Sequence, residues 1–240
     1  MRKLDWLLIG LILAACATIP SPPRPESEVA STLLSQFGPA VVKLTPPNNP
    51  RTGGTGFYMR APSGEVVTVT NGHVCELSPD KHWMQAQDDS GNGRELLEIK
   101  EISETADLCI LTGPTRAPNT LPKLGQYQGR FSRLWALGHP FLKPNTLTSG
   151  QIVGFEEIAI DDSNRIEAEC KLPTRTMEDG FCVRKVWAFE TSIVIYPGNS
   201  GSPVLTDEGE VVGVMFAGDG RSNRGVFVPL SELRALVSKY

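Results

Sequence analysis

The sequence lacks the charge imbalance that marks proteins that bind nucleic acid or other charged polymers. Its 240 residues include 23 Lys and Arg and 27 Asp and Glu, which gives a formal net charge of -4. Acids and bases are mixed, and the chain has neither a basic stripe nor an acidic tail. We therefore expect no nucleic-acid partner, and the charge balance favours no other class of ligand.

Metal-ligand patterns and internal repeats are also missing. The three histidines are scattered, and no two of the five cysteines have the close spacing of zinc ligands. The sequence therefore predicts no metal site. With 40% hydrophobic residues, the chain is nevertheless able to bury a core, either as one large all-β domain or as two small ones.

Long apolar runs are missing as well, since the run at residues 7–15 is far too short to cross a bilayer as a mature helix. It follows a positively charged N-terminus, which is the pattern of a secretion signal. It ends in Leu-Ala-Ala-Cys at residues 13–16, which resembles the bacterial lipoprotein box. We predict a signal segment at 1–16 and a lipidated Cys16 that anchors the exported protein in the bacterial cell envelope. An ordinary cleaved signal or an uncleaved anchor is the alternative.

Proline is concentrated in the next segment, 17–27. Four prolines lie within residues 20–25, and this composition favours an extended, semi-rigid spacer over a packed element. We expect a linker over 17–27 and a folded domain over 28–240.

Two short helices are predicted near the ends of the folded domain. The first has Ser27 as its N-cap and Gly38 as its terminator, with apolar residues at helical spacing. The second covers 231–239, with Ser231 as its cap. The apolar residues are Val29, Leu33, Leu34 and Phe37 in the first helix and Leu233, Leu236 and Val237 in the second.

Between these helices the sequence is a series of short β-type runs, separated by Gly, Pro, Asn and Asp at turn positions. Many short strands without long helices favour barrels or sandwiches, so we predict an all-β fold. The runs are 40–44, 56–59, 66–70, 96–99, 108–111, 133–137, 151–155, 186–189, 203–205, 211–216 and 225–228.

The strongest chemical signal is the segment Pro-Gly-Asn-Ser-Gly-Ser-Pro-Val at 197–204. A serine hydroxyl is a weak nucleophile at neutral pH, so hydrolysis by serine needs a base in hydrogen-bond reach and donors for the oxyanion. Glycines before and after Ser200 permit a tight turn that directs backbone N–H groups toward one point. Ser200 is therefore the candidate nucleophile.

A base and an orienting acid are found in two other segments. The segment Thr-Asn-Gly-His-Val at 70–74 follows a strand-like run and resembles the histidine motif of trypsin-like peptidases, which makes His73 the candidate general base, whereas His82 and His139 have weaker claims. Asp107 precedes the apolar run 108–111 and resembles the aspartate of the same family, which implies that it fixes the tautomer of His73. The order His, Asp, Ser along the chain is that of chymotrypsin and differs from those of subtilisins and α/β-hydrolases.

Together these segments resemble the trypsin-like serine peptidases over about residues 38–236. Asn199, before the serine, is closer to the HtrA and glutamyl endopeptidase branches than to digestive trypsins. The resemblance implies an all-β fold of two six-stranded antiparallel barrels, about 38–122 and 123–230.

The resemblance also implies a catalytic apparatus in the cleft between the barrels. In this layout His73, Asp107 and Ser200 form the catalytic triad, and the N–H groups of Gly198 and Ser200 form the oxyanion hole. The implied activity is that of a serine endopeptidase, which cleaves a polypeptide substrate through an acyl-enzyme and needs no cofactor.

The sequence departs from the family's pattern at three places. Ser202 replaces the commoner second glycine, as it does in glutamyl endopeptidases. Asn199 replaces the acid with which digestive trypsins bind a newly cut N-terminus, so we expect no activation by that route. The chain stops after its C-terminal helix, so we expect no PDZ domain of the kind that many HtrA proteins carry.

The family's layout gives an expectation for specificity. It places the floor of the primary pocket near Val194 and its wall at Phe216, Ala217 and Gly218. No acid occupies the floor position, which disfavours selection of Lys or Arg, and a buried unpaired charge would be costly there. We expect a small or medium apolar substrate side chain.

Four cysteines remain after Cys16, and an even number in an exported protein favours disulfides, although four sulfurs allow three pairings. Cys170 and Cys182 are the preferred pair, because they flank the hairpin-like loop 171–181. For Cys75 and Cys109 the sequence leaves two alternatives, a bond or two small buried thiols.

Other functions compete with peptide hydrolysis. The chain is alternatively a polypeptide-binding or chaperone-like module with a gated or vestigial triad, or a lipid-anchored structural module with no use for Ser200. The same nucleophile would also serve an esterase or a self-processing event.

Overall fold

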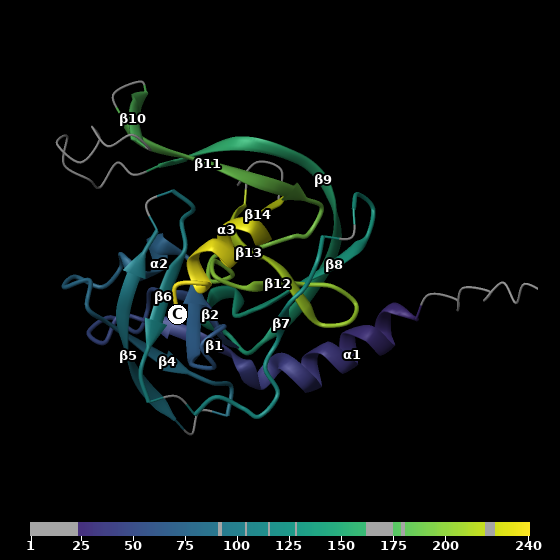
Figure 1. Cartoon of the computed structure of the whole chain (residues 1–240), viewed down its shortest axis with the longest axis horizontal. Helices are drawn as coiled ribbons and strands as arrows, with labels where there is room; N and C mark the ends of the chain where they lie inside the picture. The colour runs from purple at the N-terminus through teal and green to yellow at the C-terminus, as the bar shows by residue number, and fades with distance from the viewer. Residues whose placement is uncertain are drawn as a thin grey trace, which may run out of the picture.

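The computed structural model describes residues 24–90, 93–103, 105–114, 116–127, 129–161, 175–178, 181–218 and 224–240. These residues form two β-barrels, with a helix at each end of the domain (Figure 1). The predicted signal segment 1–16, with Cys16, lies outside them. Within the described ranges, no helix has the length and apolar character needed to cross a membrane.

The first barrel is a closed ring of six antiparallel strands in the order β1-β2-β3-β6-β5-β4. Buried apolar side chains such as Leu44, Leu97 and Leu111 fill it. The sequence pattern does not indicate β4, because Ala and Gln have low strand propensity. The strands are β1 (Val41–Thr45), β2 (Gly54–Arg60), β3 (Val66–Thr70), β4 (Trp83–Gln87), β5 (Arg94–Ile102) and β6 (Cys109–Thr112).

The second barrel is also closed. Antiparallel pairings run from β8 to β9, β11, β14, β13, β12 and back to β8. Two further strands attach to this ring, β10 to β11 and β7 in parallel to β13. The strands are β7 (Lys123–Leu124), β8 (Arg133–Gly138), β9 (Thr146–Asp161), β10 (Arg175–Glu178), β11 (Phe181–Thr191), β12 (Pro203–Leu205), β13 (Glu210–Gly218) and β14 (Gly225–Pro229). The predicted two-barrel architecture is confirmed.

Two strands of the second barrel are much longer than predicted. β9 has 16 residues and β11 has 11, and they extend together as a ribbon above the barrel (Figure 1). Phe155 stacks on Trp187 across this ribbon, with ring centroids 5.4 Å apart. The sequence indicates only the apolar centres of these strands, because exposed charged residues such as Glu156 and Glu157 interrupt the pattern.

The helix α1 (Glu26–Phe37) is present as predicted, but Ser27 is not its N-cap. Pro25 holds that position, and its carbonyl accepts the N–H groups of Glu28 and Val29 at 3.1 Å. Proline suits the position because its fixed φ agrees with the extended entry to the helix. Gly38 ends the helix as predicted and leads into the 3-10 turn η1 (Gly38–Ala40).

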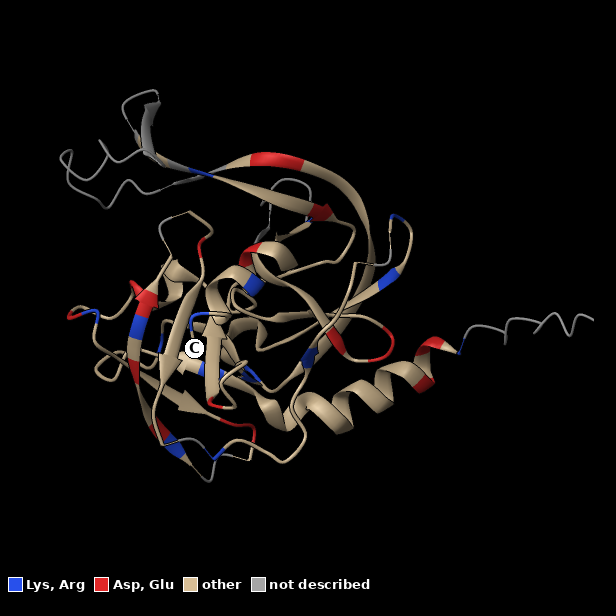
Figure 2. Cartoon of the chain, viewed as in Figure 1, with Lys and Arg blue, Asp and Glu red and all other residues tan. Residues whose placement is uncertain are grey.

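The helix α3 (Leu230–Val237) also lacks its predicted serine cap. It continues directly from β14, so Pro229 is the N-cap and Ser231 lies inside the first turn. Its buried residues pack with those of α1 and with side chains from both barrels, including Phe57 and Leu205, in one apolar cluster. The two helices therefore help to hold the barrels together. Figure 2 shows acidic and basic residues interspersed along both barrels.

Candidate active site

His73 lies on α2 (Gly72–Cys75), a single helical turn that follows β3. Asn71 leaves the strand in an extended conformation, with φ −82° and ψ 154°, and the chain enters the helix at the next residue. The His73 side chain is 34% exposed. A residue at the end of a barrel strand is thus presented to solvent by one helical turn.

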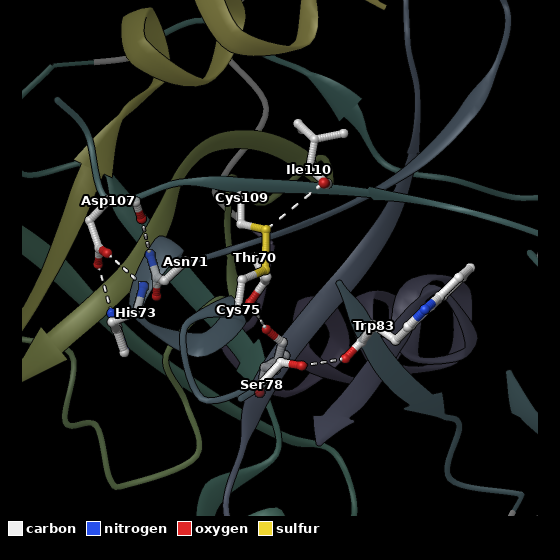
Figure 3. Close-up of a disulfide and its surroundings, with 10 residues drawn as sticks. Thr70, Asn71, His73, Cys75, Ser78, Trp83, Asp107, Cys109 and Ile110 are labelled. Carbon is white, nitrogen blue, oxygen red and sulfur yellow. Dashed lines mark hydrogen bonds and ion pairs between the residues drawn. A yellow bond between two sulfur atoms is a disulfide. The ribbon is translucent and has the colours of Figure 1, made fainter. Parts of the chain in front are cut away.

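Asp107 is fully buried and lies two residues before the start of β6, in the left-handed region with φ 50°. Its carboxylate bonds His73 twice, through Oδ2 to Nδ1 at 2.7 Å and through Oδ1 to the main-chain N at 2.9 Å (Figure 3). Its own carbonyl accepts Nδ2 of Asn71 and the N–H of Gly72, each at 3.0 Å. Aspartate tolerates the left-handed conformation better than most residues, and these bonds hold it there.

This pairing fixes the tautomer of His73. A carboxylate accepts hydrogen bonds and does not donate them, so Nδ1 of His73 carries the proton that faces Asp107. The other ring nitrogen, Nε2, is then the acceptor. The arrangement leaves His73 able to take a proton from a hydroxyl group.

Ser200 lies in the loop between β11 and β12, which turns through two glycines in the left-handed region. Gly198 has φ 96°, and a Cβ there would lie 2.5 Å from the carbonyl oxygen of His139. Gly201 has φ 88°, and a Cβ there would lie 1.9 Å from the carbonyl oxygen of Thr55. Both positions therefore require glycine, as the motif predicts.

Thr55, on β2 of the first barrel, holds the Ser200 loop in place by hydrogen bonds. Its N–H donates to the carbonyl of Ser200 at 2.7 Å, and its Oγ1 donates to the carbonyl of Gly198 at 2.7 Å. The same Oγ1 accepts the N–H of His139 at 2.9 Å. Sequence reasoning missed this residue. Its signal is the segment Gly-Gly-Thr-Gly at 53–56, where a threonine stands among glycines.

The structure brings the His73 turn and the Ser200 loop together at Gly54. A Cβ at Gly54 would lie 2.7 Å from the carbonyl oxygen of Ser200 and 2.7 Å from Cγ2 of Val74. Val74 is the neighbour of His73 on α2. The three predicted triad residues, which come from both barrels, therefore lie in one region of the molecule.

The Ser200 hydroxyl does not bond His73 in the described structure. It donates instead to the carbonyl of Phe216 at 3.0 Å. Phe216 lies on β13 where the ladder with β14 shifts register, between Met215 and Ala217. The hydroxyl hydrogen of Ser200 is therefore directed at Phe216 and not at His73.

The proposed oxyanion donors have no acceptor among the described residues. The N–H groups of Gly198 and Ser200 make no hydrogen bond there, whereas the N–H of Asn199 bonds Tyr196 at 3.0 Å and that of Gly201 bonds Met215 at 2.7 Å. Two unpaired donors in the loop of a candidate nucleophile fit an anion-binding role. That role stays a prediction.

The residues predicted to line the primary pocket lie on neighbouring segments. Gly225 pairs with Gly218 and donates its N–H to Ile193 at 2.8 Å, next to Val194. Phe216 is buried, whereas Val194 is 38% exposed. The side chain of Val194 is therefore open to solvent, and its place at the floor of a pocket stays a prediction, as does the wall formed by 216–218.

Cys75 and Cys109 form a disulfide, which settles the alternative that the sequence left open (Figure 3). Both residues are fully buried. Cys182 is also in a disulfide, but its predicted partner Cys170 lies outside the described residues.

His139 is buried beneath the Ser200 loop, with Nδ1 2.9 Å from the carbonyl oxygen of Lys143. Asp89 lies 3.4 Å from the same nitrogen. Burial is the main influence and lowers the pKa of His139 from its usual value, although the carbonyl and Asp89 act in the opposite direction. His139 contributes to the site through its main chain, which bonds Thr55.

Comparison with known proteins gives one family and a set of relatives. A family model described as the trypsin-like peptidase domain matches residues 54–214. Serine protease HTRA2, mitochondrial, from Bos taurus is 27% identical over 217 residues, which cover 85% of this chain and 42% of that protein. Serine protease HTRA3 from Homo sapiens is 26% identical over 209 residues, which cover 81% of this chain and 41% of that protein. The chain thus spans about two fifths of the length of these curated relatives.

Solved structures share the fold. The Rv3671c protease from M. tuberculosis, in its active form, superposes with a TM-score of 0.68 and 18% identity, over 100% of this chain and 93% of that chain. At this level of identity, the likeness is one of fold.

Proposed function

This chain belongs to the family of trypsin-like peptidase domains, and on that premise we propose that it is a serine endopeptidase with the triad His73, Asp107 and Ser200. The observation that carries the proposal is the pair of hydrogen bonds that the Asp107 carboxylate accepts from His73, at 2.7 and 2.9 Å, beside the loop that bears Ser200. This pair prepares the imidazole to act as a general base.

The proposed reaction proceeds by acyl transfer. The Ser200 hydroxyl turns away from Phe216, gives its proton to Nε2 of His73, and its oxygen attacks the carbonyl carbon of the scissile peptide bond. The N–H groups of Gly198 and Ser200 stabilise the oxyanion that develops. His73 then returns the proton to the leaving amine, and water hydrolyses the acyl-enzyme by the same steps.

We further propose that the substrate is a polypeptide and that the chain acts outside the cytoplasm, anchored by lipid on Cys16. The signal-like pattern at 1–16 supports this location. The disulfide between Cys75 and Cys109 agrees with it, because such bonds persist in oxidising compartments.

A fluorophosphonate probe tests the triad, because it reacts with activated serines and does not depend on knowledge of the substrate. We expect covalent labelling of the purified chain, and loss of labelling in Ser200→Ala and in His73→Ala. Ser202→Ala, which alters a second serine of the same loop, should still be labelled. Equal labelling of Ser200→Ala and the natural chain would contradict the proposal.

One observation favours a second candidate, a polypeptide-binding module with a gated triad. The Ser200 hydroxyl bonds Phe216 and not His73 in the described structure. If the folded natural chain takes no label but binds unfolded polypeptides, this second function replaces the first.

A further inference from the structure

The disulfide between Cys75 and Cys109 joins the two segments that carry His73 and Asp107. Cys75 is the last residue of α2, two positions after His73, and Cys109 is the first residue of β6, two positions after Asp107. The hydrogen bonds of Asp107 to residues 71–73 and the covalent bond therefore link the same pair of segments, side by side (Figure 3).

Neither segment is held firmly by its own local structure. α2 has only four residues, and one isolated helical turn is unstable because helix nucleation is unfavourable. Asp107 lies before β6 and outside its ladder, which begins at Cys109, and its backbone is left-handed. A left-handed residue persists only where its surroundings impose the conformation. The geometry of the pair therefore depends on what keeps α2 against the start of β6.

The disulfide meets that requirement at close range. The Cα atoms of the two cysteines are 6.5 Å apart, and both side chains are buried in the core of the first barrel. Any movement of α2 away from β6 would have to stretch this link. A loss of about 1 Å in the placement of a catalytic group can cost a large factor in rate, so a short covalent link beside the pair bears directly on reactivity.

We propose that the Cys75–Cys109 disulfide is a positioning bridge, which holds His73 against Asp107 so that Ser200 reaches its full reactivity only in the oxidised chain. This inference rests on the proposed function. In the forming step, the Cys75 and Cys109 thiols give two electrons and two protons to an external disulfide, which becomes two thiols. Both cysteines are fully buried in the folded chain, where an external disulfide does not reach them, so the exchange takes place during folding.

The chain offers a matched control for simple stabilisation. Cys182, on β11 of the second barrel, is in another disulfide. Removal of either bridge releases a constraint on the unfolded chain and lowers stability. Only removal of the Cys75–Cys109 bridge should alter the His73–Asp107 pair.

The test compares the double variant Cys75→Ala/Cys109→Ala with Cys182→Ala, each well below its own melting temperature. The first readout is the second-order rate of fluorophosphonate labelling. The second is the far-downfield proton NMR resonance of the Nδ1–H of His73 that faces Asp107, which needs no catalysis. We expect the double variant to label about tenfold more slowly or worse and to lose or broaden the resonance. Cys182→Ala should keep both.

The opposite outcomes are distinct. If the double variant keeps the natural labelling rate and resonance and only its melting temperature falls, the bridge merely stabilises the fold and the inference is wrong. If the natural chain takes no label, the proposed function fails, but the resonance still decides whether the bridge positions His73.

If the double variant does not fold, a second experiment uses the natural chain, refolded in increasing concentrations of a dithiol that keeps part of the cysteines reduced. Mass spectrometry of alkylated cysteines then identifies the molecules in which this bridge is reduced. We expect those molecules to keep their near-ultraviolet circular dichroism and to label about tenfold more slowly or worse. Labelling at the natural rate with both thiols alkylated, or slower labelling only together with loss of the circular dichroism, would overturn the inference.

Discussion

At the residue scale, the tautomer of His73 depends on one carboxylate. Asp107 accepts from Nδ1 of His73, and this leaves Nε2 as the acceptor. An asparagine at 107 has nearly the same size, but its amide can donate to Nδ1 and so favours the unproductive tautomer.

We therefore expect Asp107→Asn to fold and to lower the rate of fluorophosphonate labelling by about 10³- to 10⁴-fold. Asp80→Asn, in an exposed turn, is the control and should label at the natural rate. A labelling rate for Asp107→Asn within a few-fold of the natural one would mean that the carboxylate does not orient the base.

His139 gives the chain a specific sensitivity to acid. Its pKa in the folded chain lies below the ordinary value of 6.5 because the ring is buried. At and above pH 7 both the folded and the unfolded chain hold it neutral, and its contribution is fully present. Below pH 7, His139 binds a proton in the unfolded chain more readily than in the folded chain. The free energy of unfolding therefore falls as pH falls.

The variant His139→Asn should remove this part of the acid dependence. Between pH 6.5 and 5.5 the natural chain should lose up to about 1 kcal/mol more unfolding free energy than the variant. Urea unfolding at both pH values measures it, with His82→Asn, an exposed histidine, as the control. Parallel pH profiles for His139→Asn and the natural chain would refute the assignment.

The sequence predicts the backbone conformation of the Ser200 loop better than the hydrogen bonds of its side chains. The glycines at 198 and 201 could be predicted, because a turn around a nucleophile needs left-handed backbone. The bond from Ser200 to Phe216 could not, because it depends on how β13 shifts register against β14. Thr55 was missed for a similar reason, since its partner Gly198 lies 143 positions along the chain.

At the scale of the element, β2 supports the Ser200 loop through the hydroxyl of one residue. Thr55 Oγ1 accepts from the N–H of His139 and donates to the carbonyl of Gly198. Valine has the same shape without the hydroxyl, so Thr55→Val leaves both of these main-chain groups unpaired. The cost is about 1–3 kcal/mol for the buried N–H of His139 and less for the carbonyl of Gly198, which is only partly buried.

We expect Thr55→Val to be less stable in urea and to label with the fluorophosphonate more slowly, because the loop that holds Gly198 loses its support. Thr55→Ser keeps the hydroxyl and should retain most of both properties. If Thr55→Val and Thr55→Ser behave alike, the hydroxyl does not support the loop.

Element boundaries show where local patterns stop being informative. Strands with apolar centres were predicted, whereas β4 was missed and β9 and β11 were predicted too short. The predicted serine caps of α1 and α3 are wrong, because prolines already set the entry angles. The turn α2 has too few residues to give a periodic signal, and its contacts with β5 and β6 fix it.

At the scale of the whole molecule, the many short strands predicted an all-β fold, and the resemblance to trypsin-like peptidases implied the two barrels. The pairing of four cysteines did not, because three pairings satisfy the same sequence. Only the fold shows that Cys75 and Cys109 lie on adjacent segments.

The proposed anchor is also a property of the whole molecule. If lipid on Cys16 holds the chain to the envelope, Cys16→Ser should move it from the membrane fraction to the soluble fraction without a change in labelling rate. Fractionation and the mass of the N-terminal peptide measure this. A Cys16→Ser chain that stays with the membranes would exclude the lipid anchor.

The bonds from Thr55 to the Ser200 loop also set an order in time. During synthesis the first barrel, with His73 and Asp107, is made before residues 198–200. Gly198, the partner of Thr55, is added 143 residues after it. Between residues 107 and 200 a nascent chain therefore carries the proposed base and acid but not the proposed nucleophile. If His73, Asp107 and Ser200 form the proposed triad, a ribosome-bound fragment that ends before residue 200 cannot cleave itself or its neighbours.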